Sequence, residues 1–190
     1  MHTDTKDTNT NTNTWKRTAL LWLPTFAGFP LGGLIAKLTT GHVDAVAPAL
    51  GGGAISGAVL GLAQWIAIRR SGISPEAWVA TTAIGFAAGL GAGAAAVGYH
   101  TDLGSLAAQG AVCGAVVGAA QVVVLGRNLG RLALAWPPLL SALWALGWTI
   151  TSAAGIDVEA QYTVFGSSGA LVVTVATSVL PLRLRRTSHG

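Results

Sequence analysis

Charged residues are scarce in this 190-residue sequence. Lysine, arginine, aspartate and glutamate together make up 9% of the residues, whereas about a quarter of a soluble domain is charged. Hydrophobic residues make up 52% of the chain, and its mean hydropathy is +0.58. So few charged side chains cannot cover a surface that faces water. The composition therefore predicts an integral membrane protein.

Cysteine is also scarce. The single cysteine, Cys113, lies in an apolar run between Gly110 and Gly114. One cysteine excludes an intramolecular disulfide and a thiolate metal cluster, so we expect Cys113 to be a small packing residue. No other metal-ligand spacing is specific for any metal, and we predict neither a metal site nor a cofactor.

The alternation of apolar and polar residues that a membrane β-barrel requires is missing as well. Instead, uncharged stretches of about 20 residues separate the charged positions, and a helix of this length crosses the hydrocarbon of a bilayer. The predicted fold class is an all-α membrane protein with six transmembrane helices. The expected spans are residues 18–38, 46–68, 77–99, 104–126, 132–154 and 161–182.

The basic residues indicate how these spans are oriented. If the N-terminus is cytoplasmic, ten of the eleven lysines and arginines fall on the cytoplasmic side and only Lys37 falls outside. The positive-inside rule therefore predicts that both termini are cytoplasmic. Residues 1–14 hold almost no apolar residue and are expected to form a disordered tail, and residues 183–190 form a second tail. The basic residues build no continuous basic face, so we expect no nucleic-acid partner.

An internal repeat organises the transmembrane region, residues 15–182. When the chain is slid along itself so that Gly53 lies over Gly110, residues 53–64 align with residues 110–121, and three glycines and a glutamine coincide. A third, diverged copy runs from Asp157 through Gly169 to Arg183. The sequence thus predicts three tandem helical hairpins, about 15–70, 77–127 and 132–183, which run parallel to one another around a pseudo-threefold axis along the membrane normal. A tryptophan opens each hairpin and is expected in the cytoplasmic interfacial belt: Trp15, Trp78 and Trp136.

Nine glycines fall four residues apart in three rows. The rows are Gly53, Gly57 and Gly61; Gly85, Gly89 and Gly93; and Gly110, Gly114 and Gly118. Helices in lipid associate through close packing, which small residues permit. The spacing, which is that of a glycine zipper, therefore predicts helix-packing surfaces.

A few polar residues interrupt the apolar spans or connect them. Gln64 and Gln121 lie near the cytoplasmic ends of their helices, where they either form interhelical hydrogen bonds or line a polar vestibule. Asp44, Asp102 and Asp157 recur at the outer turns, where they either cap helices or form an outer cation or proton site. His42 and His100 precede two of these aspartates by two residues.

One segment resembles a known group of proteins. Gly57, Gly61, Gln64-Trp65 and Arg69-Arg70 match the G-x-x-x-G-x-x-Q-W-x-x-L-R-R unit that is repeated in uncharacterised small multi-pass membrane proteins of bacteria. The resemblance covers roughly residues 50 to 150, and the second copy departs from it, with Val122 and Gly126 at two motif positions. It implies a multi-pass bacterial membrane protein with internal repeats, and it implies no activity.

An enzymatic function is not expected. Gly166-Ser167-Ser168-Gly169 resembles the G-x-S-G motif of rhomboid proteases, but no intramembrane histidine follows that could act as a base for Ser168. We predict a non-enzymatic protein of the bacterial cytoplasmic membrane, surrounded by lipid, that packs with itself as a homo-oligomer or with a partner membrane protein. The alternative is a small transporter or channel with a path along the pseudo-threefold axis, with the aspartates at its outer mouth and Gln64 and Gln121 at its inner mouth.

Overall fold

The computed structural model describes residues 20–155 and 167–187, and these residues form helices and turns with no strand. Four helical segments are long and apolar enough to cross a membrane: Leu20–Thr40, Val46–Ser71, Pro75–Ala96 and Leu103–Ala153. A shorter apolar helix covers Ser168–Pro181. The predicted all-helical class, with helices of membrane-spanning length, is confirmed for the described residues.

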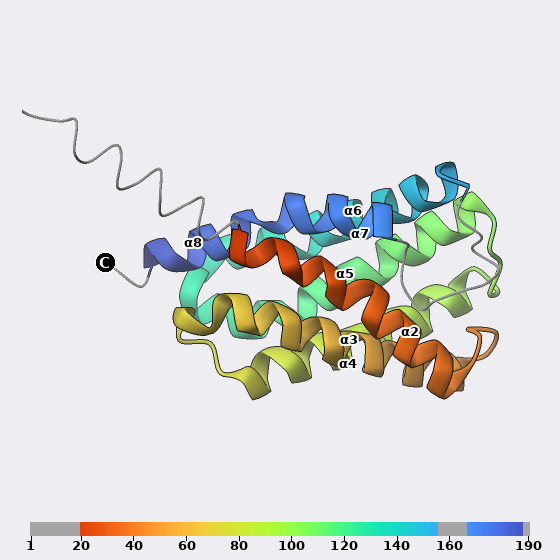
Figure 1. Ribbon diagram of the computed structural model, residues 1–190, viewed down its shortest axis with the longest axis horizontal. Coiled ribbons are helices and arrows are strands. Elements are labelled where there is room, and N and C mark those ends of the chain that lie inside the picture. The colour runs from red at the N-terminus through yellow and green to blue at the C-terminus, as the bar shows by residue number, and fades with distance from the viewer. Residues whose placement is uncertain (1–19, 156–166, 188–190) are drawn as a thin grey trace, which may run out of the picture.

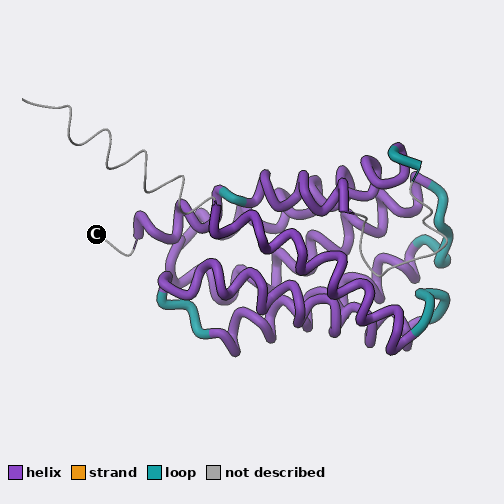
Figure 2. Tube along the Cα trace, viewed as in Figure 1, coloured by secondary structure: helices purple, strands orange, loops and turns teal. Residues whose placement is uncertain are grey.

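The helices follow one another with short connections (Figures 1 and 2). In chain order they are η1 (Leu23–Ala27), α2 (Gly28–Thr40), α3 (Val46–Ile68), η2 (Arg69–Ser71), α4 (Pro75–Ala96), α5 (Leu103–Leu129), η3 (Gly130–Ala135), α6 (Trp136–Ala153), α7 (Ser167–Thr177) and α8 (Val179–Thr187). The segment Leu103–Ala153 thus contains two helices, α5 and α6, which fold back on each other around η3.

Local sequence signals explain where the helices begin and end. Ser74 accepts a hydrogen bond from the backbone N–H of Ala77, and Pro75 follows at the first helical position, so α4 begins there. Gly41 ends α2 with a φ of +78°, a left-handed value that a residue with a Cβ rarely adopts. Pro24 lies in the tighter 3-10 turn η1, which separates the helical residues 20–22 from α2.

Neighbouring helices in the chain are also neighbours in space. The successive pairs from α2 to α7 pack against each other, and α7 also contacts η1 and α2, which closes the row into a ring. We call one end of this bundle the arginine end, because η2, the last turn of α5, η3 and α8 carry exposed arginines there: Arg69, Arg70, Arg127, Arg131 and Arg183. The turns between α2 and α3 and between α4 and α5 lie at the opposite end, which we call the aspartate end after Asp44 and Asp102.

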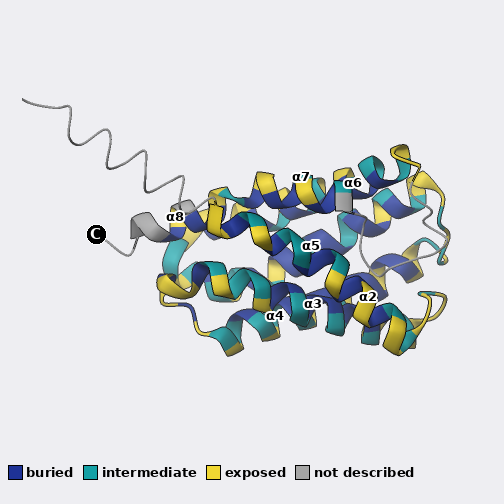
Figure 3. Ribbon diagram, viewed as in Figure 1, coloured by how far each residue is buried: buried dark blue, intermediate teal, exposed yellow. Residues whose placement is uncertain are grey.

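Large aromatic side chains fill the centre of the ring. Trp144 of α6 packs against Phe29 of α2 at a ring-centroid distance of 6.1 Å and against Phe86 of α4 at 4.9 Å. Buried residues face this interior, and exposed ones face outward (Figure 3). The outward side chains include many large apolar ones, such as Leu31, Leu38 and Ile84, which are 52%, 77% and 67% exposed.

The expected interfacial positions of the tryptophans are wrong where the structure describes them. Trp78 is fully buried and Trp136 is 7% exposed, so both belong to the protein interior. Trp136 is buried there because its indole N–H has a hydrogen-bond acceptor inside the bundle, the side chain of Gln121. Trp15 lies outside the described residues.

Candidate functional site

A small polar cavity lies between α2, α3, α5, α6 and α7. Its walls are formed by Phe29, Leu60, Gln64, Val117, Gln121, Trp136, Leu140, Trp144, Val173 and Thr177. The cavity leaves about 10 Å³ for the centre of a water molecule, which is roughly the volume that one buried water needs. Its polar side chains are amides, a hydroxyl and indoles, and none of its wall residues is ionisable.

Gln121 is held at both ends of its amide. Its Nε2 donates to the Thr82 hydroxyl of α4 at 2.9 Å, and its Oε1 accepts from the Trp136 indole of α6 at 2.6 Å. The side chain is only 2% exposed. Gln121 therefore connects α5 with the helices on both sides of it.

Thr177 makes the corresponding contact at the closure of the ring. Its hydroxyl donates to the backbone carbonyl of Val173 at 2.8 Å and accepts from the Trp22 indole at 3.2 Å. The same indole also donates to the carbonyl of Thr174 at 3.1 Å. Trp22, 1% exposed, thereby connects the first helical segment with α7.

Gln64 differs from Gln121. Its Oε1 is buried and has no hydrogen-bond partner, and the same holds for Nε1 of Trp78 on α4. A buried polar atom without a partner costs about 1–3 kcal/mol. Gln64 is a wall residue of the cavity and Trp78 is not, so the Gln64 amide is the candidate contact for a bound molecule.

The residues of this region recur at nearly constant intervals in the chain. The slide that lays Gly53 over Gly110 also lays Gln64 over Gln121, and almost the same slide lays Gln121 over Thr177. Two aromatic sets follow nearly the same interval: Trp22, Trp78 and Trp136, and Phe29, Phe86 and Trp144. The two glutamines were predicted from the sequence, whereas Trp22, Thr177 and the second aromatic set were missed, although the slide that lays Gly53 over Gly110 comes within one residue of each of them.

The nine glycines of the three rows lie where adjacent helices approach each other. A Cβ on Gly57 of α3 would lie 2.7 Å from the carbonyl oxygen of Thr82 on α4, and a Cβ on Gly89 of α4 would lie 2.9 Å from Cα of Cys113 on α5. Within each row, all three glycines face one neighbouring helix. Gly53 and Gly61 also face α4, and Gly85 and Gly93 also face α5. The third row, Gly110, Gly114 and Gly118, faces α6. Each row is thus covered by the next helix of the same chain.

The two described aspartates at the opposite end, Asp44 and Asp102, differ in their local roles. Asp102 caps α5, because its carboxylate accepts hydrogen bonds from the Ser105 backbone N–H at 3.1 Å and from the Ser105 hydroxyl at 2.5 Å. The side-chain hydrogen bond and then the backbone one lower the pKa of Asp102 below its ordinary value of 3.8. Ala45, not Asp44, is the N-cap of α3, with no side-chain hydrogen bond there. Asp157 lies outside the described residues.

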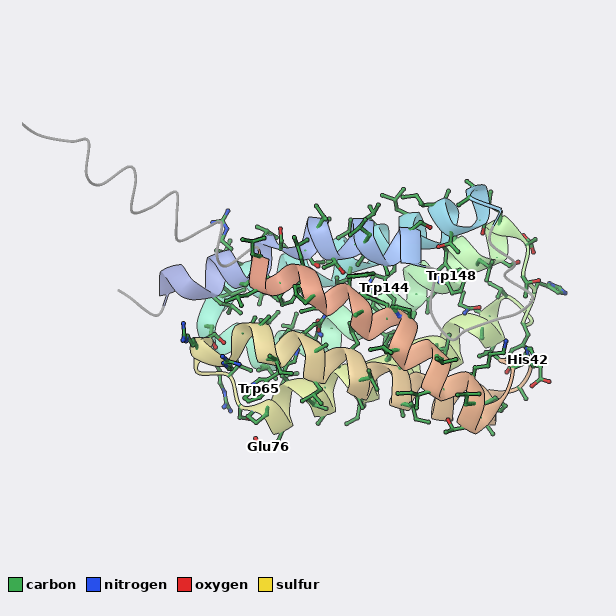
Figure 4. The ribbon with its side chains drawn as sticks, viewed as in Figure 1. His42, Trp65, Glu76, Trp144 and Trp148 are labelled. Atoms are coloured by element: carbon green, nitrogen blue, oxygen red, sulfur yellow. The ribbon has the colours of Figure 1, made fainter. Side chains whose placement is uncertain are left out.

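Within residues 20–155 and 167–187, no three histidine, cysteine, aspartate or glutamate side chains gather in a way that could hold a metal ion. Figure 4 shows His42 at the aspartate end, Trp65 and Glu76 at the arginine end, and Trp144 and Trp148 between them. The polar cavity is therefore the candidate site. The chain matches no protein family, no curated protein and no solved structure.

Proposed function

We propose that this chain is a six-span membrane protein that passes a small, uncharged, hydrogen-bonding solute along the axis of its helix ring. The observation that carries the proposal is the cavity, where Gln64, Gln121 and Thr177 meet between five helices. On this proposal the structure represents a closed state, because Phe29, Phe86 and Trp144 pack together in the ring, and Phe29 and Trp144 form part of the cavity wall.

Six spans and three hairpin repeats are part of this proposal. The hairpins are α2 with α3, α4 with α5, and α6 with α7, each a pair of packed neighbours. The nearly constant interval between corresponding cavity and aromatic residues supports a tandem repeat. So do the crossing points within the hairpins, where Gly32 meets Ser56, Gly89 meets Cys113 and Gly169 meets Gly147.

The wall chemistry supports an uncharged solute. A charge inside a membrane protein is costly unless an opposite charge or a water-filled space accompanies it. Amide, hydroxyl and indole groups instead offer hydrogen bonds without charge. A solute that can donate and accept hydrogen bonds therefore suits this cavity better than an ion.

The charges at the two ends support one orientation in the membrane. Five exposed arginines lie at the arginine end, whereas Lys37, Asp44 and Asp102 lie near the other. The positive-inside rule supports a cytoplasmic arginine end, and we propose the cytoplasmic membrane of a bacterium as the location. The exposed leucines and isoleucines would then face lipid.

Packing with itself or with a partner membrane protein stays a prediction. Its motivation was the three glycine rows, and these rows are covered by helices of the same chain. An association surface would therefore have to use other residues. This is why the axial cavity, and not an intermolecular glycine contact, is our leading basis for function.

Flux measurements in proteoliposomes test the proposal. Liposomes with the purified protein should shrink or swell faster than empty ones in osmotic gradients of water, urea or glycerol, and Gln121→Leu should change the rate. Gly126→Ala is a matched control on the same helix, since a Cβ there would meet nothing within 4 Å. The proposal fails if the permeability to all these solutes, and to ammonia, equals that of empty liposomes.

A further inference from the structure

The arginine end carries more positive charge than its carboxylates balance. Among the described residues, its five exposed arginines are accompanied by one carboxylate, that of Glu76 (Figure 4), so the excess is five minus one, or four positive charges. The segments that carry the arginines are joined to one another. The side-chain amide of Asn128, at the end of α5, donates to the backbone carbonyl of Ser71 in η2 at 3.0 Å, and α8 packs against both α5 and η2. The charges therefore belong to one continuous surface.

An exposed apolar side chain precedes an exposed arginine by four residues on three separate helical segments. This spacing places two side chains on the same helix face, one turn apart. The pairs are Ile66 and Arg70, Val123 and Arg127, and Val179 and Arg183. The apolar members are 50%, 73% and 40% exposed, in that order. Because α3, α5 and α8 all run towards the arginine end (Figure 1), each apolar side chain lies nearer the middle of the bundle than its arginine.

We infer that the arginine end is a binding surface for anionic phospholipids, whose phosphates pair with the arginines and whose acyl chains lie along the apolar side chains one turn away. The guanidinium group presents a planar fork of N–H donors that matches the oxygens of a phosphate. One helical turn is about 5 Å long, so charge and apolar surface follow each other in the same order as the phosphate and acyl chains of a lipid.

The apolar side chains are the reason to favour a lipid over a soluble polyanion. A nucleic acid or an acidic protein would pair with the arginines but would leave the exposed isoleucine and valines beneath them without a partner. Trp65 supports the same level in the bilayer. It lies half-buried at the arginine end, and its indole N–H donates to the carbonyl of Ile73 at 3.1 Å, an arrangement that suits the headgroup region.

This surface goes beyond the proposed solute path, although it rests on the membrane location and the orientation that we propose with that path. A cytoplasmic arginine end would meet the leaflet surface whose anionic lipids attract basic segments. That attraction falls off within a Debye length, about 10 Å at 0.1 M salt, so arginines at headgroup level are placed to benefit from it.

Electron paramagnetic resonance of the full chain in phosphatidylcholine bilayers, with a trace of spin-labelled lipid, tests the surface. Spin-labelled phosphatidylglycerol should associate with the protein at least about twice as strongly as spin-labelled phosphatidylcholine, and salt of about 1 M should lower this ratio by screening. The combined change Arg70→Gln, Arg127→Gln and Arg183→Gln should remove at least half of the excess. Arginine-to-lysine changes at the same three positions keep the charge, and they should retain a preference for phosphatidylglycerol.

Lys37→Gln is the charge-matched control for Arg127→Gln, because it removes one positive charge near the other end of the bundle. It should lower the ratio less than Arg127→Gln does. The inference is overturned if phosphatidylglycerol has no advantage over phosphatidylcholine, if the three glutamines leave that advantage intact, or if Lys37→Gln lowers it as much as Arg127→Gln. Binding of a soluble polyanion without a preference for phosphatidylglycerol would also overturn it.

Flux separates this inference from the proposed function. A preference for phosphatidylglycerol in a protein without any solute flux would contradict the solute path alone. Flux without that preference would contradict the lipid surface alone. A protein that immobilises neither spin-labelled lipid is not embedded in the bilayer, and this result would contradict both.

Discussion

Gln121 shows how much one side chain can connect in this bundle. Its amide joins three helices through one donated and one accepted hydrogen bond, to Thr82 and from Trp136. In water such a network would compete with solvent, but in lipid the freed groups find few alternatives. Interhelical hydrogen bonds between membrane helices are nevertheless modest, about 0.6 kcal/mol on average and up to about 1.7 kcal/mol.

We predict that Gln121→Leu lowers the free energy of unfolding by about 1–2 kcal/mol, because it removes two interhelical hydrogen bonds and leaves the Trp136 N–H buried without an acceptor. Gln64→Leu is the control at the corresponding position, and it should cost clearly less, because Oε1 of Gln64 has no protein partner to lose. Thermal or denaturant unfolding in detergent measures both. Equal losses would contradict the distinction between the two glutamines.

The sequence predicted only part of this set of residues. Gln64 and Gln121 stand out because they are identical amides, at matching positions of the aligned segments 53–64 and 110–121, in apolar surroundings. Thr177 lies almost the same interval after Gln121, but as a different residue type, so a comparison of the sequence with itself does not mark it. The position directly after the polar tail favours Trp15 as the first tryptophan of the series, whereas the spacing and the hydrogen bond to Thr177 favour Trp22.

At the scale of helices, the glycine rows determine how closely neighbours approach. The Gly57 position lies so near α4 that a methyl group would be 2.7 Å from the Thr82 carbonyl oxygen and 2.8 Å from Cα of Ala83. Backbone atoms cannot move aside as a flexible side chain can. Adding one carbon there must push the two helices apart.

We predict that Gly57→Ala destabilises the bundle by about 1–3 kcal/mol, the usual cost of overpacking a closely packed interior. Gly126→Ala on α5 is the matched change, and it should be neutral or slightly stabilising, because its Cβ meets nothing within 4 Å and alanine favours a helix. Unfolding curves of the two variants at equal lipid-to-detergent ratio test this. A Gly57→Ala protein as stable as Gly126→Ala would refute the close contact.

Helix positions followed well from the sequence, and side-chain directions did not. The expected span 46–68 coincides with α3, and spans 77–99 and 104–126 overlap α4 and α5, because long apolar runs between charged turns mark them. The buried positions of Trp78 and Trp136 could not be read in this way. A tryptophan near the end of a span suits the interface and the interior equally well by composition.

For the molecule as a whole, the sequence did not predict that the helices close into a ring. The contact of α7 with η1 and α2 joins segments from opposite ends of the chain. Trp22 and Thr177, for example, are 155 residues apart in the sequence. The aromatic layer of Phe29, Phe86 and Trp144 depends on that closure. The resemblance to repeated bacterial membrane proteins stays a prediction.

We propose that the two chemically different ends of the bundle lie on opposite sides of a membrane. Single cysteines replacing Asp44, Asp102, Glu76 and Arg127, all exposed, would each be introduced in a Cys113→Ala background, since Cys113 is the only cysteine. In intact bacterial cells, an impermeant maleimide should label Asp44→Cys and Asp102→Cys, and should label Glu76→Cys and Arg127→Cys only after the cells are opened. Labelling of only Glu76→Cys and Arg127→Cys from outside would contradict the orientation, and labelling of one position from each end would contradict the spans themselves.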